Sequence, residues 1–155
     1  MDDATFIQMC TESTTAFYRV AISILRKQHD AEDAVQQALM KGWTSRKRIW
    51  KGSEQAWMMR VVINECRTIQ RHRMRTSPVE HLPETPSDLP DMTLRAAIDA
   101  LPETLRLPLL LKYMESMSEK EIAIALSLSV PAVKSRLHRA RQALRNELNE
   151  EVEWP

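Results

Sequence analysis

The segment SEKEIAIALSLSVPAVKSRLHRAR, residues 118–141, decides the fold of this chain, because it predicts two short helices joined by a tight turn. Ser118 followed by Glu121 matches the capping-box pattern, in which each side chain caps the first turn of the same helix. Ser129 can cap the second helix, and Pro131 falls in its first turn, where the missing N–H of proline costs nothing. The pattern therefore predicts a helix-turn-helix.

The second of these helices has an apolar seam and a basic outer side. At 100° per residue, one narrow stripe is formed by Val133, Leu137, Ala140 and Leu144. Arg or Ser at the centre of the opposite face can bond to base edges, and flanking Lys and Arg can bind phosphates. A solvated, Arg-rich face of a helical bundle is the alternative. The side chains expected to contact DNA are Lys134, Ser135, Arg136, His138, Arg139 and Arg141.

The composition favours a helical protein, and the sequence shows no recognisable catalytic motif. The chain has 155 residues, only 2 glycines, and many Leu, Ala, Met, Arg, Lys and Glu residues, which favour helices. No nucleophile–base set, metal-ligand cluster or Gly-rich phosphate loop is recognisable, so we expect no enzyme activity, no metal and no cofactor. Cys10 and Cys66 fit neither a metal spacing nor a disulfide framework. Without a signal-peptide pattern or an apolar run of about 18 residues, the expected location is the cytoplasm.

Positive charge is concentrated in two blocks, although the net charge of the whole chain is only +1. Residues 41–76 contain ten Lys or Arg against Glu54 and Glu65, a net charge of +8. Residues 129–146 contain five Lys or Arg and no acid. Two basic blocks are typical of two contacts with a polyanion, although charge alone fits two solvated helix faces equally well.

A proline-rich segment separates the two blocks. Four of the eight prolines fall within residues 74–92, where their density rules out a continuous helix. Fully extended, this segment could span about 60 Å. We therefore predict an all-α protein of two small helical domains, residues 1–75 and 93–150, joined by a flexible linker over residues 76–92.

Helical periodicity predicts the elements on each side of the linker. Three or four helices are expected before it, over about residues 5–28 with a possible break, 30–43 and 54–73, with Asp30 capping the helix that begins there. Trp43 and Trp57 are predicted to be core residues. After the linker, two helices separated near Pro102 are expected to precede the helix-turn-helix.

Three segments together resemble a known family. The segment LPETLRLPLLLKYMESMSEKEIAIALSLSVPAVKSRLHRARQALR, residues 101–145, resembles the −35-binding domain of the sigma factors of bacterial RNA polymerase. DAEDAVQQALMKGW (30–43) and WMMRVVINECR (57–67) resemble the −10-binding domain of the same proteins. The match covers about residues 12–148. Because a linker replaces a middle domain, the chain is similar to the extracytoplasmic-function (ECF) class of the sigma-70 family.

The resemblance implies a function and a set of partners. It implies a sigma subunit that binds core RNA polymerase and directs promoter-specific initiation by binding −35 duplex and opened −10 DNA. The implied partners are the largest-subunit coiled-coil and the second-largest-subunit flap of the polymerase, promoter DNA, and an anti-sigma factor, which in this class is often membrane-bound. No small-molecule substrate is implied. The rival hypothesis is a stand-alone helix-turn-helix regulator that binds DNA without polymerase.

The resemblance also assigns roles to single residues. The implied polymerase contacts are Asp33, Gln36, Gln37 and Met40. The implied −10 contacts are Arg46, Lys47, Arg48, Trp50, Lys51, Arg60, Asn64 and Arg67, and the −35 contacts are the six side chains given above. An aromatic ring within a cationic loop, as at Trp50, is also the pattern that binds single strands. Ser116 and Ser127 stand where glycine is frequent in the family, so those turns are expected either to differ from the family's turns or to carry slight strain.

Overall fold

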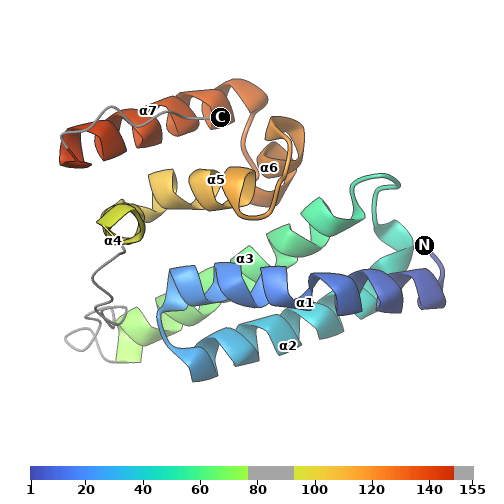
Figure 1. Ribbon diagram of the computed structural model, residues 1–155. Helices are drawn as coiled ribbons and strands as arrows, with labels where there is room; N and C mark the ends of the chain where they lie inside the picture. The colour runs from blue at the N-terminus through green and yellow to red at the C-terminus, as the bar shows by residue number, and fades with distance from the viewer. Residues whose placement is uncertain (77–92, 149–155) are drawn as a thin grey trace.

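The structure, a computed structural model, describes residues 1–76 and 93–148. Within these ranges it contains α-helices, one short 3-10 helix and no strand, which confirms the all-α prediction. The predicted linker lies outside the described residues, apart from Thr76 at the end of the third helix. The N-terminal unit comprises α1 (Asp3–Leu25), α2 (Gln28–Thr44), η1 (Arg46–Arg48) and α3 (Glu54–Thr76). The C-terminal unit comprises α4 (Thr93–Ala100), α5 (Glu103–Tyr113), α6 (Glu119–Leu126) and α7 (Val130–Leu148) (Figure 1).

The N-terminal unit is a three-helix bundle around aromatic and aliphatic side chains. Asp2 caps α1, because its Oδ1 accepts a hydrogen bond from the backbone N–H of Thr5 at 2.7 Å. Helix α1 then buries Phe6, Phe17 and other apolar residues against α2 and α3. Gly42 of α2 lies so close to α3 that an added Cβ would fall 2.3 Å from the Met58 sulfur. Any side chain at this position would force the Met58 side chain to move.

The start of α2 differs from the prediction. Asp30 was expected to cap it, but the helix begins at Gln28 and Lys27 occupies the N-cap without a side-chain bond. The Asp30 carboxylate forms an ion pair with Arg73 of α3 instead. The capping prediction is therefore wrong, because an arginine 43 residues away offers the carboxylate a charged partner.

The helix-turn-helix forms as the sequence predicts. The Ser118 N–H donates to Glu121 Oε1 at 3.0 Å, and the Glu121 N–H donates to Ser118 Oγ at 3.1 Å, which completes the capping box. Ser129 Oγ accepts from the N–H of Ala132 at 3.2 Å and so caps α7. The four seam residues of α7 are all fully buried against the other helices of this unit.

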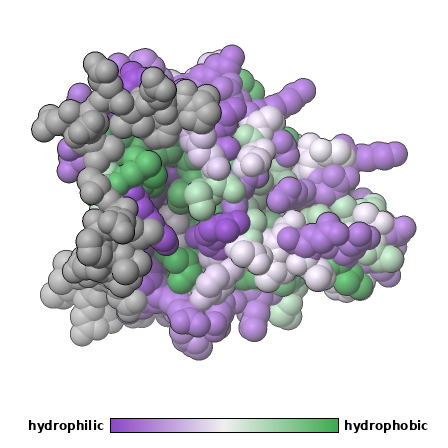
Figure 2. Space-filling view, viewed as in Figure 1, coloured by the Kyte–Doolittle hydropathy of each residue, from purple (hydrophilic) through white to green (hydrophobic). Residues whose placement is uncertain are grey.

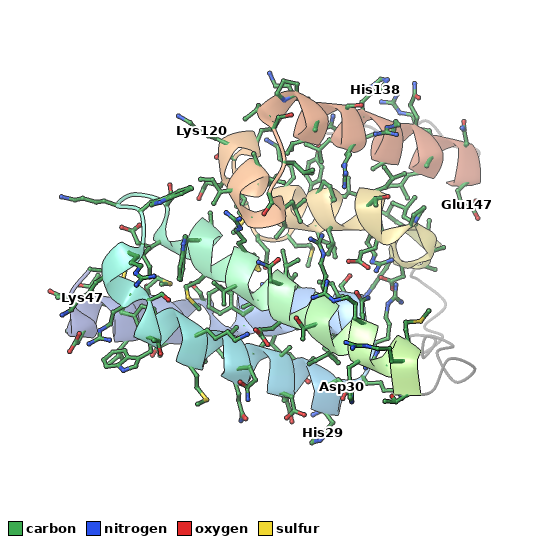
Figure 3. The ribbon with its side chains drawn as sticks, turned by 180° about the vertical axis from the view of Figure 1, so that it is seen from behind. His29, Asp30, Lys47, Lys120, His138 and Glu147 are labelled. Atoms are coloured by element: carbon green, nitrogen blue, oxygen red, sulfur yellow. The ribbon has the colours of Figure 1, made fainter. Side chains whose placement is uncertain are left out.

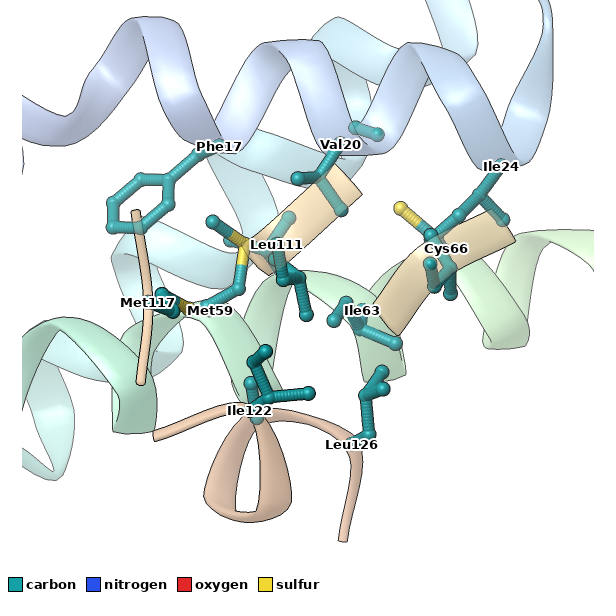
Figure 4. Packing of buried hydrophobic residues seen from close by; sticks show 14 of the residues in the cluster. Phe17, Val20, Ile24, Met59, Ile63, Cys66, Leu111, Met117, Ile122 and Leu126 are labelled. Atoms are coloured by element: carbon teal, nitrogen blue, oxygen red, sulfur yellow. The ribbon is translucent and has the colours of Figure 1, made fainter. Parts of the chain in front are cut away.

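The two units share one hydrophobic core. Helix α6 lies across α3, and its Ile122 and Leu126 pack toward Met59 and Ile63 (Figure 4). Leu111 of α5 closes the same cluster beside α1. The helix-turn-helix therefore has two roles in packing, since it holds α7 on one side and covers the N-terminal unit on the other.

Hydrophilic side chains cover much of the face shown in Figure 2, with smaller apolar patches between them. In the described part of the chain, every helix is too short or too polar to cross a membrane.

Candidate nucleic-acid interface

The outer face of α7 carries a row of available polar side chains. Lys134, Ser135, His138 and Arg139 are all exposed, and Figure 3 shows His138 on the side of α7 that points away from the protein. Lys134 makes only a long, exposed ion pair of 3.8 Å with Glu119, a contact of little energy. The donors of this face are therefore free to meet base edges and phosphates.

Two of the six predicted −35 contacts lie in different surroundings. Arg136 is half-buried at the edge of a groove between the two units. Arg141 is held by α5, because its Nε and Nη2 donate to the Tyr113 hydroxyl oxygen at 3.0 and 2.6 Å. The structure thus brings four of the predicted residues to one outward face and places two on its shoulders.

The loop after α2 displays a second cationic surface. Lys47, Arg48 and Lys51 are exposed, and Trp50 is 55% exposed, as a base-stacking side chain requires. Ile49 is buried between them and anchors the loop. Figure 1 shows this loop at the same end of the molecule as the N-terminus.

Arg46 differs from the other cations of this loop. Its side chain is only 20% exposed, because it is bound between Asp3 and Trp43. Trp43 was predicted to be a core residue, and this prediction is wrong, since the ring is 38% exposed. The ring packs edge-on against Phe6 at 5.8 Å between centroids, and Arg46 covers one face of it. Trp57, in contrast, is half-buried and packs against the core, as predicted.

The exposed side of α3 continues the surface of the loop. Arg60, Asn64 and Arg67 are spaced four and three residues apart, so they lie on one face of the helix. Asn64 is exposed, whereas Arg60 and Arg67 are half-buried. This face adjoins the stripe of α3 that α6 covers.

An exposed stripe on α2 carries the predicted polymerase contacts. Asp33, Gln36, Gln37 and Met40 are all exposed, on the side of the helix away from its buried alanines. Met40 is 64% exposed, and an apolar side chain displayed within a polar stripe is a common component of protein interfaces.

A groove of about 590 Å³ runs between the two units. Its apolar surface comes from Met74, Leu107, Pro108 and Leu126, and its cations from Arg67, Arg71, Arg75 and Arg136. No group of metal-binding side chains occurs in the residues that the structure describes. The sequence did not predict this groove, because its walls come from helices on both sides of the linker.

Sequence reasoning also missed three residues that organise these surfaces. Asp3 holds Arg46, Tyr113 holds Arg141, and Arg106 joins the two units. The partners are separated by 43, 28 and 83 residues, so no local pattern could reveal the pairs. The only hint in the sequence was the large number of arginines, since each of these pairs includes one arginine.

Burial and hydrogen bonding shift the pKa of a few groups. Burial raises the pKa of the Cys66 thiol to about 12 and that of Cys10 to about 11, so both thiols are neutral at neutral pH. The pKa of Glu54 is lowered, chiefly because the backbone N–H of Gly52 donates to its carboxylate at 2.9 Å. That bond fixes the end of the basic loop onto the start of α3.

Family comparisons match both units. Residues 13–76 match the model of Sigma-70 region 2, and residues 91–144 match that of Sigma-70, region 4. The first match contains α2, the basic loop and α3, and the second contains the helix-turn-helix. All the predicted polymerase and −10 contacts lie in the first match, and all the predicted −35 contacts lie in the second.

Curated relatives carry the same family name. The chain is 35% identical to an RNA polymerase sigma-E factor of Streptomyces coelicolor, over 86% of this chain and 80% of that protein. It is 26% identical to RNA polymerase sigma factor SigV of Bacillus subtilis, over 96% and 93%. It is also 32% identical to ECF RNA polymerase sigma factor SigE of Mycolicibacterium smegmatis over 84% of this chain, but spans only 56% of that protein.

Solved structures show the same arrangement of helices. The sigma factor RpoE of Bartonella quintana, solved in complex with the anti-sigma factor NepR, matches with a TM-score of 0.81 and 26% identity, over 96% of this chain and 99% of the other. CnrH, solved with the cytosolic domain of CnrY, shares the fold with a TM-score of 0.70 and 23% identity, over 97% and 92%. With both sigma regions matched in order and a helix-turn-helix whose polar face is open, the chain belongs to the ECF class of the sigma-70 family and is a promoter-specific transcription initiation factor.

Proposed function

We propose that three surfaces of this chain divide the work of a sigma subunit. The stripe on α2 binds the coiled-coil of the largest polymerase subunit through Asp33, Gln36, Gln37 and Met40. The basic loop and α3 hold the opened −10 strand through Lys47, Arg48, Trp50, Lys51, Arg60, Asn64 and Arg67. Helix α7 binds −35 duplex through Ser135, His138 and Arg139, with Lys134, Arg136 and Arg141 beside them. The C-terminal unit would also contact the flap of the second-largest subunit.

The observation that carries the proposal is the division of α7 into two faces. Its seam is fully buried, whereas Ser135 and Arg139 on the opposite face are exposed and point away from the protein. A recognition helix needs this division, because one face must hold the helix while the other enters the major groove.

The chain would act without any catalytic centre of its own, in the cytoplasm, where bacterial RNA polymerase works. Sigma-70 relatives have a regulatory role, and the surfaces described above are built to bind macromolecules. Its contribution is recognition and strand capture, while the polymerase supplies the chemistry.

The two units are in contact in this structure, but the spacing of the promoter elements implies that they separate when the chain binds a promoter. The −35 and −10 elements lie about 25 base pairs apart, which is about 85 Å along B-DNA. A compact chain of this length has a radius of gyration of about 15 Å. One rigid body of that size cannot reach both elements, so we propose that α6 leaves α3 in the promoter complex.

Run-off transcription with purified core polymerase tests the proposal. The chain is expected to produce transcripts from specific start sites in genomic DNA, and the double variant Ser135→Ala, Arg139→Ala is expected to lose them. Arg95→Ala is the matched control, because Arg95 is exposed on α4 and belongs to none of these three surfaces. A stand-alone regulator, which the family matches do not favour, would bind its DNA site equally well without polymerase. That result, with no specific transcript, would refute the proposal.

We also propose that an anti-sigma factor regulates the chain. Two similar structures were solved with a partner, which in RpoE is an anti-sigma factor. The groove between the units is lined by apolar side chains and by four arginines against one acid, Glu103, and this lining complements an acidic amphipathic segment. A candidate anti-sigma protein is expected to stop run-off transcription and to lose this effect when Arg71 and Arg75 are changed to Glu. Undiminished inhibition of the double variant would place the contact elsewhere.

A further inference from the structure

The basic loop is attached to the N-terminal turn of α1 through one arginine. Arg46 Nε donates to Asp3 Oδ1 at 2.6 Å, and Nη1 donates to the backbone carbonyl oxygen of Trp43 at 2.7 Å. The guanidinium carbon lies 3.8 Å from the centre of the Trp43 ring, in cation–π contact. The side chain therefore meets a carboxylate, a helix carbonyl and an aromatic face at once.

Each of these contacts suits a guanidinium better than any other side chain. The Trp43 carbonyl is one of the last of α2, where the backbone N–H of the C-cap Ser45 also donates to it, so the cationic Arg46 adds a stronger donor and favours the negative end of the helix dipole. The planar group can lie flat on the indole while its edges donate in two directions. Phe6 supports the other side of this arrangement through its edge-on contact with Trp43.

The rest of the loop is fixed by separate contacts. Ile49 is buried, and the Arg48 N–H donates to the Ser45 carbonyl at 2.8 Å. At the far end, Glu54 accepts the Gly52 N–H at 2.9 Å. Arg46 is thus the link between the first turn of the loop and α1, whereas Lys47, Trp50 and Lys51 project from a frame that is already anchored.

We propose that Arg46 is a positioning residue for the −10 strand, and that Asp3 is its obligatory partner. Arg46 fixes the first turn of the loop against α1, and the exposed side chains that follow it make the contacts with DNA. The charge of Arg46 is largely matched by Asp3, so Lys47, Arg48 and Lys51 supply the charge that phosphates meet. This inference rests on the proposed function, because it concerns the surface assigned there to the −10 strand.

The test compares Asp3→Ala, Arg46→Ala and the double variant in holoenzyme made from purified core polymerase and the full chain. The probe is a promoter that yields a run-off transcript, together with two sets of single-base changes, one in its −10 element and one in its −35 element. Open-complex formation is followed by permanganate reactivity. The quantity compared is the preference for the native −10 base over its substitutes.

We expect Asp3→Ala and Arg46→Ala each to reduce this preference by about tenfold, because a contact side chain displaced by an ångström loses its selectivity. The double variant should be no worse than either single variant, since both break the same link. Discrimination at the −35 element should stay unchanged. Arg46→Lys should be intermediate, because an ammonium can pair with Asp3 but cannot also reach the Trp43 carbonyl in the same plane.

Two control variants separate positioning from stability and from direct contact. Asp2→Ala removes the cap of α1 one residue away, so it lowers the melting temperature without touching Arg46, and it should keep −10 discrimination. Lys47→Ala should weaken the binding of holoenzyme to all promoters alike. It should also lower the slope of the logarithm of the binding constant against the logarithm of the salt concentration by about 1. Arg46→Ala should leave that slope unchanged.

Three outcomes would overturn the inference. If Asp3→Ala keeps the native preference while Arg46→Ala loses it and reduces the salt slope, Arg46 binds DNA directly. If Asp2→Ala loses discrimination to the same extent, stability explains the effect. If neither Asp3→Ala nor Arg46→Ala changes the preference, the link has no role in strand capture. Failure of the unaltered chain to give any specific transcript would instead refute the proposed function.

Discussion

Arg106 of α5 is bound to Ser23 of α1 by two hydrogen bonds, from Nε to Oγ and from Nη2 to the backbone carbonyl oxygen, each 2.9 Å long. Its Nη1 donates to the carbonyl oxygen of Leu101 at 2.8 Å. Burial lowers the pKa of this arginine from its usual value, yet the group keeps its proton, because arginine stays charged in proteins. A buried guanidinium thus joins the two units that, in the proposed function, separate at a promoter.

Removal of the Arg106 guanidinium should destabilise the described arrangement. Arg106→Met keeps much of the apolar stem but removes three hydrogen bonds and takes the donor from the buried Leu101 carbonyl oxygen, so we expect a loss of about 2 to 4 kcal/mol in the free energy of unfolding. Urea unfolding measures it, and Arg95→Ala, on the exposed side of α4, should change stability by less than about 0.5 kcal/mol. Equal effects of both variants would mean that the contacts of Arg106 contribute nothing specific.

The ion pair between Arg19 and Glu115 should help to keep the two units in contact in the free chain. Arg19 Nη2 lies 2.6 Å from Glu115 Oε1, and the Glu115 side chain is almost fully buried. Arg19→Glu should place two negative charges there and raise the radius of gyration above the value of about 15 Å expected for a compact chain. The exchange Arg19→Glu with Glu115→Arg should restore it.

Small-angle X-ray scattering of the free chain makes this measurement. Lys27→Glu is the control, since it makes the same change of charge at an exposed position of the N-terminal unit. A radius that stays constant in Arg19→Glu would show that apolar contacts alone keep the units together.

Replacing either of two serines in turns of the C-terminal unit by glycine should raise the free energy of unfolding. Ser116 and Ser127 have φ angles of 55° and 57°, the left-handed region in which a Cβ is strained, as predicted from the sequence. Replacement of either by Gly should stabilise the chain by about 0.5 to 1 kcal/mol, the relief of strain less the entropy that glycine loses. Thermal unfolding measures the change. Ser45→Gly, at a φ of −101°, should not stabilise, and a gain there would contradict the explanation.

The outward face and the shoulder of α7 should respond differently to truncation. Arg139→Ala should relax the preference at one −35 base pair by about 1 to 3 kcal/mol, because an exposed, unpaired arginine on this face can reach a base edge. Arg141→Ala should weaken the binding of holoenzyme to all promoters alike. Binding of holoenzyme to −35 variants distinguishes these effects.

Tyr113→Phe is the matched variant for Arg141. It removes the hydroxyl oxygen that accepts two bonds from Arg141 but keeps the aromatic ring. If this oxygen positions the Arg141 side chain, the variant should weaken holoenzyme binding to all promoters equally, as Arg141→Ala does, but by a smaller factor. A change of base preference in either variant would place Arg141 on the face that contacts bases.

The pH dependence of stability should include a contribution from Glu54. Its folded pKa lies below the usual value of 4.5, so the carboxylate stabilises the fold above the unfolded pKa, and this is lost as the pH falls through the folded pKa. Glu54→Gln should therefore flatten the decline of stability between about pH 5 and pH 3. Thermal unfolding across that range measures the slope, and equal slopes would mean that the Gly52 bond does not favour the ionised form.

The helix-turn-helix could be predicted almost completely from the sequence. The cap at Ser118, the cap at Ser129 and the seam of α7 all depend on residues within four positions of each other, so local geometry determines them. Interactions of this range form when no distant group competes for the same side chains. The strain expected at Ser127 came instead from the family resemblance, because glycine is frequent at that position in the family.

Competition between distant charged groups could not be predicted. Asp30 was assigned to cap α2, but helix packing places Arg73 of α3 beside its carboxylate, and the two form an ion pair. Trp43 was assigned to the core, but its ring is 38% exposed and Arg46 covers one face of it. The sequence showed that arginines were plentiful, but could not show which of them remain free for DNA.

The sequence by itself therefore determined the helices, the helix-turn-helix and the family, because periodicity, caps and motifs are short-range properties. Only the tertiary structure decided how the two units meet, which cations are already paired, and which surface lies open. These depend on contacts such as Arg106 with Ser23 and Arg46 with Asp3, across 83 and 43 residues. A guanidinium can satisfy many partners equally well, so its choice is made only when packing brings one of them within hydrogen-bond distance.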